Sequence, residues 1–80
     1  MNKVFVLIEE GAIDGDHFYG VDGVFADLEH AKKILGEITR EAKNKGWSDT
    51  EEKELYFETW IDGEYNWNHW RFEIVEEFIR

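Results

Sequence analysis

The first apolar segment of the chain is short and unbroken. Five consecutive apolar residues run from Val4 to Ile8, and three of them are β-branched. Charged residues, Lys3 and Glu9, bound the run on either side. A short run of this composition is typical of a strand that is covered on both faces. The pattern therefore predicts a strand over residues 3–9 in the interior of a sheet.

A second strand-like segment follows from His17 to Phe25. Residues 10–16, between the two segments, combine two glycines with three acids, which is turn chemistry. Gly20 and Gly23 interrupt the second segment, so we expect it to be bulged or bent. The two segments are predicted to form a β-hairpin with a loop of about six residues.

Helical periodicity begins after Asp27. Apolar residues then recur mostly three or four positions apart, at Leu28, Ala31, Ile34, Leu35, Ile38 and Ala42. Asp27 is placed to accept a hydrogen bond from the first turn, and Gly46 suits the residue that ends a helix. We therefore expect an amphipathic helix over residues 28–45. Gly36 falls inside it, where it either marks close packing on the sheet or is simply tolerated.

The second half of the chain has two more strand patterns. Residues 47–52 are interpreted as a polar connection, and residues 53–61 alternate between apolar and polar positions. Asp62 and Gly63 form a hairpin signal. In the final segment, residues 66–78, alternate positions are again apolar. The side chains predicted to share one face in these two strands are Leu55, Phe57, Thr59 and Ile61, then Trp70, Phe72, Ile74 and Phe78.

The predicted order of elements is therefore ββαββ within a single domain, residues 1–80. The architecture that follows is α+β with two layers, an antiparallel four-stranded sheet with one helix packed on one face.

Composition excludes several classes of protein. The chain has no Cys and therefore neither a disulfide framework nor a thiolate zinc site. Its formal net charge of −10 argues against direct binding of nucleic acid. Glu9 and Glu10 follow the first apolar run so closely that we expect neither a signal peptide nor a membrane span, and we expect a cytoplasmic protein.

The first half of the chain contains the segment Val4 to Glu9, a turn at Asp14 and Gly15, and a Gly-Val-Phe segment that runs into Asp27 and the predicted helix. In these features it resembles a family of very short uncharacterised bacterial and phage proteins. It covers about residues 3–45. The resemblance implies the fold and a prokaryotic or phage setting, and it transfers no catalytic residue.

Catalytic and metal-binding patterns are weak. His17, His30 and His69 lie in three separate predicted elements, without the spacing of a metal site. Asp14 and Asp16 lack the continuation of a calcium loop. We therefore predict no enzyme, no cofactor and no metal. A pocket formed by Trp60, Tyr65 and His69 is the one candidate for a small ligand.

The acidity is concentrated late in the chain. Residues 1–48 carry a net charge of −3 and residues 49–80 a net charge of −7. Glu52, Glu54 and Glu58 share a parity, which predicts a row of carboxylates on one face of a strand. Large aromatic residues accompany them, a combination that is typical of a protein-binding patch. The predicted partner-binding residues are Glu52, Glu54, Glu58, Trp60, Glu64, Tyr65, Trp67 and Trp70. The alternatives are a solvated acidic face and aromatic pairing within the hairpin.

These features favour a small acidic protein-binding module whose partner is a protein with a basic surface. One form of the hypothesis is a phage-encoded inhibitor, similar to anti-CRISPR proteins, that acts as a nucleic-acid mimic and masks a nucleic-acid-binding surface of a host defence protein. The alternative is a homodimeric structural or housekeeping module that self-associates through a strand edge or its aromatic face.

Overall fold

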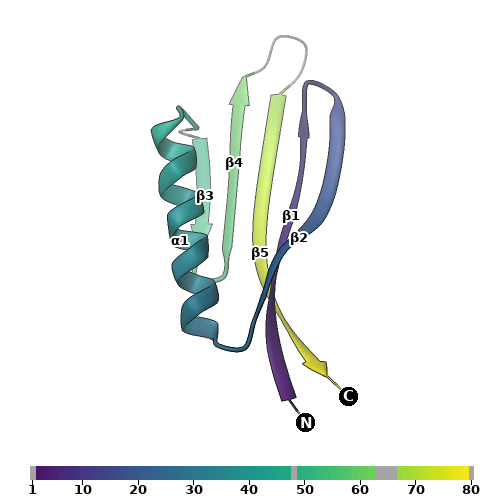
Figure 1. Ribbon diagram of the computed structural model, residues 1–80. Helices are drawn as coiled ribbons and strands as arrows, with labels where there is room; N and C mark the ends of the chain where they lie inside the picture. Colours follow the sequence, from purple (N-terminus) through teal and green to yellow (C-terminus); the bar gives the residue numbers. More distant parts are fainter. Residues whose placement is uncertain (1, 48, 63–66, 80) are drawn as a thin grey trace.

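The chain forms two layers, a five-stranded antiparallel sheet and one helix that covers one face of the sheet (Figure 1). The computed structural model describes residues 2–47, 49–62 and 67–79, and in residues 61, 62 and 67 the backbone alone. The strands are β1 (Asn2–Ile13), β2 (Asp16–Phe25), β3 (Asp49–Lys53), β4 (Tyr56–Asp62) and β5 (Trp67–Ile79), and the helix is α1 (Leu28–Asn44). The order across the sheet is β2-β1-β5-β4-β3, so the first and last strands of the chain lie side by side.

The prediction of a four-stranded ββαββ fold is wrong, because the sheet has a fifth strand. Residues 47–52, interpreted as a polar connection, contain most of β3, and a turn at residues 54–55 divides the predicted strand 53–61. The sequence of β3, Asp-Thr-Glu-Glu-Lys, has no apolar residue. Because β3 is an edge strand, its side chains need no apolar alternation, and hydrophobic periodicity does not detect it.

The predicted six-residue loop of the first hairpin is also wrong. Only Asp14 and Gly15 separate β1 from β2, and both have positive φ, 51° and 86°. Positive φ at both central residues is typical of the type I′ turn that joins closely paired strands. The predicted bulge is confirmed: Leu7 pairs with Gly23 and Ile8 with Val21, which leaves Asp22 as the extra residue.

The helix prediction is confirmed to within one residue. The Asp27 side chain accepts a 2.8 Å hydrogen bond from the N–H of Glu29, and Gly46 follows the helix with a φ of 100°. A Cβ atom at Gly36 would meet nothing within 4 Å, so this glycine is tolerated and does not mark close packing. The described part of the chain contains no helix that is both long and apolar enough to cross a membrane.

The core lies between α1 and the middle of the sheet. Its buried residues are Leu7, Ala31, Leu35, Ala42, Phe57, Thr59, Phe72 and Ile74. The predicted alternation is therefore confirmed for Phe57, Thr59, Phe72 and Ile74. Thr59 is accommodated because its hydroxyl donates a 3.0 Å hydrogen bond to the carbonyl oxygen of Asp49. Phe78 shares this face, as predicted, but it lies near the end of β5, which extends beyond the helix (Figure 1), and it is 58% exposed.

The first strand is covered on one face only. β1 lies inside the sheet between β2 and β5, as predicted. Its odd-numbered residue Leu7 is fully buried under α1, whereas Val4, Val6 and Ile8 point to the other side of the sheet. Among the described residues no element packs over that side, so the prediction that both faces are covered is wrong. We call the side opposite α1 the open face.

Candidate docking face of the sheet

Side chains on the open face form rows across the strands, because residues paired in register share a face. Named from β2 towards β3, the rows are His17, Ala12, His69, Trp60 and Asp49; then Tyr19, Glu10, Arg71, Glu58 and Glu51; then Val21, Ile8, Glu73, Tyr56 and Lys53; and finally Val24, Val6 and Val75. The next pair is Val4 and Glu77. The face therefore has an apolar half near the chain termini and a charged half near the hairpin turns.

The apolar half consists of β-branched aliphatic side chains from three adjacent strands. Its members are Val4, Val6, Ile8, Val21, Val24 and Val75. Val21 and Val24, on the edge strand β2, are 57% and 60% exposed. A contiguous apolar patch on the surface of a small protein is typical of an interaction site.

Glu58 lies at the centre of the charged half. Its carboxylate accepts a hydrogen bond from the hydroxyl of Tyr56 and pairs with Nε2 of His69. The ring of Trp60 stacks on that of His69, with centroids 6.1 Å apart and an interplanar angle of 27°. These contacts fix the orientation of the side chains in a polar network on β4 and β5.

Arg71 lies in the next strand, beside Glu58, and connects two further carboxylates. Its guanidinium donates to Glu10 at 2.9 and 3.1 Å and to Glu73 at 3.1 Å. Burial lowers the pKa of Arg71, but the hydrogen bonds and charges of the two glutamates outweigh burial and raise the pKa above its usual value. The described residues of the open face include six carboxylates, Glu10, Asp49, Glu51, Glu58, Glu73 and Glu77, and two basic side chains, Lys53 and Arg71. The formal charge of this face is therefore −4.

We expect Tyr56 to titrate far above an ordinary tyrosine. Burial, followed by the hydrogen bond to Glu58 and its charge, raises the pKa of Tyr56 to about 12. Because the folded state holds this proton more tightly than the unfolded state, the stability gained is complete below about pH 10 and is lost as pH rises towards 12. Ultraviolet absorbance of tyrosinate in the folded protein measures the titration.

Two variants assign the titration at high pH to Tyr56. Tyr56→Phe should remove it, and Glu58→Gln should move it to lower pH. Titration of Tyr56 near pH 10, the usual value for a tyrosine, would contradict the described network.

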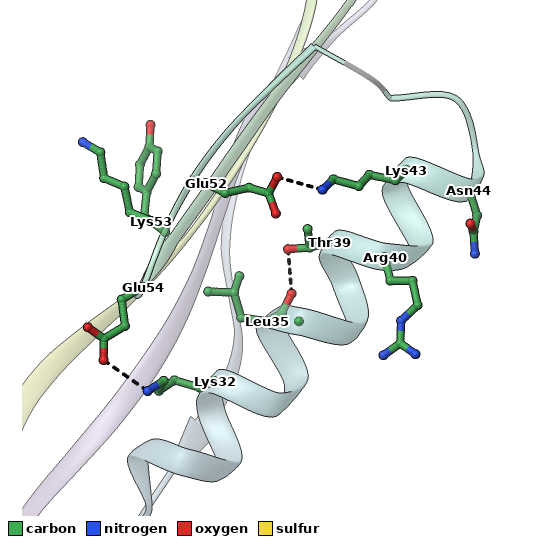
Figure 2. A pocket seen from close by; sticks show the side chains of 11 residues that line it. Lys32, Leu35, Thr39, Arg40, Lys43, Asn44, Glu52, Lys53 and Glu54 are labelled. Atoms are coloured by element: carbon green, nitrogen blue, oxygen red, sulfur yellow. Dashed lines mark hydrogen bonds and ion pairs between the residues drawn. The ribbon is translucent and has the colours of Figure 1, made fainter.

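The predicted row of carboxylates does not exist, because the β3–β4 turn reverses the chain within it. Glu58 is on the open face, but Glu52 and Glu54 point towards the helix (Figure 2). Glu52 pairs with Lys43 at 2.7 Å and Glu54 with Lys32 at 3.1 Å. The structure thus separates Glu52 and Glu54 from Glu58 by the thickness of the sheet.

The two ion pairs span a groove of about 520 Å³ between α1 and β3 (Figure 2). The helix lines it with Leu35, Gly36 and Thr39, and the Thr39 hydroxyl is turned back to the carbonyl oxygen of Leu35 at 2.9 Å. The groove carries Arg40 in addition to the two paired lysines, whereas the side chain of Lys53 points away from the helix (Figure 2). Its excess of positive charge makes it the wrong surface for a basic partner.

The predicted aromatic residues divide between the two faces. Trp60 lies on the open face, whereas Trp70 lies on the helix side, where its ring is 5.6 Å from that of Trp47 and its indole N–H donates to Glu9. Burial and the neighbouring Asp22 raise the pKa of Glu9, although the bond from Trp70 opposes the shift. Glu64 and Tyr65 lie outside the described residues, as does the side chain of Trp67, which begins β5.

Two histidines that the sequence separated are close in the fold. His17 and His69 flank Ala12 in one row of the open face, beside a hollow of about 480 Å³. Within the described residues, no three His, Cys, Asp or Glu side chains come together as metal ligands. The hollow and the apolar half were both missed from sequence, although the single predicted helix already implied that one face of the sheet would lack a cover.

These elements define a small α+β protein in which one helix covers one face of a five-stranded antiparallel sheet and the other face is open, acidic and partly apolar. Comparison with protein-family models, with curated proteins and with solved structures found no match. The resemblance over residues 3–45 therefore stays a prediction.

Proposed function

We propose that this protein is a non-catalytic binding module that docks its open face on a basic surface of another protein. The observation that carries the proposal is the composition of this face, with an apolar patch directly beside a cluster of carboxylates. Burial of the patch would supply affinity, because apolar area removed from water contributes about 25 cal/mol per Å². The carboxylates would select a partner of opposite charge and speed its approach.

The dimensions of the molecule support a docking role. Its principal extents are 47 × 22 × 15 Å, so the sheet presents one of the two broad sides of a thin plate. The outline of that side is similar in size to the area of about 800 Å² that each partner buries in a standard protein interface. The area is therefore sufficient for a specific complex.

A basic surface of matching size occurs on proteins that bind nucleic acid. The more specific form of the proposal is therefore a phage-encoded inhibitor that covers such a surface on a host defence protein. The open face, rather than a row formed by Glu52, Glu54 and Glu58, would act as the nucleic-acid mimic.

Association kinetics with a partner captured from a prokaryotic lysate and then purified would test the proposal. Reversing two exposed charges of the open face, Glu51→Lys and Glu77→Lys, should slow association at least tenfold at low salt and weaken its salt dependence. The matched control is Glu37→Lys with Glu41→Lys, the same charge change on exposed positions of α1. A partner of acidic composition, or equal slowing by both pairs of substitutions, would contradict the proposal.

A further inference from the structure

The two edge strands of the sheet differ sharply. β3 has five residues, of which four are charged. β2 has ten residues, and it contains no lysine, arginine or proline. Its side chains Tyr19, Val21 and Val24 are 66%, 57% and 60% exposed. Short length and charge are devices that protect an edge from pairing with another chain, and β2 has few of them.

The free edge of β2 is also accessible. Within the described residues, β2 pairs with β1 alone, so alternate N–H and C=O groups of its other edge have no strand partner. The half of β2 next to the Asp14–Gly15 turn lies at the edge of the sheet that is far from α1 (Figure 1). The bulge at Asp22 leaves residues 16–21 as an uninterrupted run.

We propose that β2 pairs antiparallel with β2 of a second copy. The two-fold axis passes between the two Gly20 residues, and the two sheets join into a single sheet of ten strands. An antiparallel strand can pair with itself about a two-fold axis, which makes a second copy a suitable occupant of this edge. This register places Tyr19 of each copy opposite Val21 of the other. Aromatic and β-branched residues form favourable cross-strand pairs, and the pairing covers two of the most exposed apolar side chains.

The charges of β2 agree with this register. Within residues 19–21, the part of this register that the bulge at Asp22 leaves uninterrupted in both copies, no two carboxylates face each other. The two Gly20 residues lie opposite each other beside the axis. Within a single chain, a Cβ atom at Gly20 would meet nothing within 4 Å. Since Tyr19 pairs with Val21 and both belong to the open face, the open faces of the two copies lie on the same side of the joined sheet.

Sedimentation equilibrium tests the pairing. We expect the parent protein to show twice its chain mass of 9.6 kDa, and we expect Tyr19→Lys with Val21→Lys to weaken self-association at least tenfold. The control is Phe78→Lys, which removes an apolar side chain of similar exposure, 58%, from a strand that is not an edge. Circular dichroism establishes that each variant is folded.

A cross-link locates the axis. The chain has no cysteine, so Gly20→Cys introduces a single thiol, which should form a disulfide-linked dimer readily because residues opposed across an antiparallel pair satisfy disulfide geometry. Gly36→Cys, on the helix, should not. A parent protein that is monomeric at all concentrations, equal dissociation of the Phe78 control, or equal cross-linking at both positions would overturn the proposal. None of these results depends on the proposed basic partner.

Discussion

Replacing Phe72 with alanine is expected to remove a large part of the free energy of unfolding. Phe72 is 2% exposed on the central strand β5, and its ring centroid is 6.4 Å from that of Phe57 and 5.3 Å from that of Trp70. Truncating a buried phenylalanine costs about 3–5 kcal/mol. A chain of this length is stable by roughly 4–12 kcal/mol, so the loss ranges from about a quarter of the free energy of unfolding to all of it. Urea denaturation followed by circular dichroism measures it.

The same strand provides the control. Phe78→Ala is the same substitution at an exposed position, and we expect it to change the free energy of unfolding by no more than about 0.5 kcal/mol. Equal losses at the two positions would show that the helix does not cover the sheet as described.

Replacing Gly11 with alanine is expected to destabilise the protein by about 1–3 kcal/mol. A Cβ atom at Gly11 would collide with the carbonyl oxygen of His69 and lie 2.8 Å from the ring of Phe18. The Phe18 ring can rotate, but the carbonyl oxygen belongs to the backbone of β5 and can move only if the pairing of β1 with β5 shifts. Thermal or urea unfolding of the parent protein and the variant measures the difference in the free energy of unfolding.

A second glycine tests whether this effect is specific to the close approach. Gly36→Ala adds the same methyl group where nothing lies within 4 Å, inside a helix that alanine favours. We expect it to stabilise the protein by about 1 kcal/mol. Changes of the same sign at the two positions would argue against the described packing.

The helix was predictable because its signals are local. The apolar stripe, the Asp27 cap and Gly46 all act within a few residues of one another, and the structure reproduces each of them. The same is true of Phe57 and Phe72, whose alternation with polar neighbours identified the buried face.

The fifth strand was not predictable from periodicity. The residues of β3 are held in the sheet by pairing with β4, and their side chains carry no apolar pattern of their own. The length of the first loop had a signal, since Asp-Gly favours a two-residue type I′ turn, but the acids and glycines around it favoured a longer loop.

The candidate site was predictable in part. Glu58 and Trp60 were identified from sequence and lie on the open face, whereas Glu52, Glu54 and Trp70 lie on the helix side. Odd-numbered and even-numbered residues point to opposite faces only within one continuous strand. The turn at residues 54–55 ends one strand and begins another, so the rule does not relate Glu52 and Glu54 to Glu58. The apolar half was missed because the unbroken run from Val4 to Ile8 was interpreted as a strand covered on both faces, although a single helix can cover only one.

The central claim is that the open face is the docking surface, and side-chain NMR of the complex with the captured partner tests it most directly. The two tryptophans form a matched pair of probes, since Trp60 lies on the open face and Trp70 on the helix side. We expect the indole N–H signal of Trp60 and the methyl signals of Val6 and Val24 to shift on binding, while the Trp70 indole signal and the methyl signals of Ile34 and Ile38 on α1 stay unchanged. Shifts at Trp70 and the helix with an unperturbed Trp60 would contradict the account.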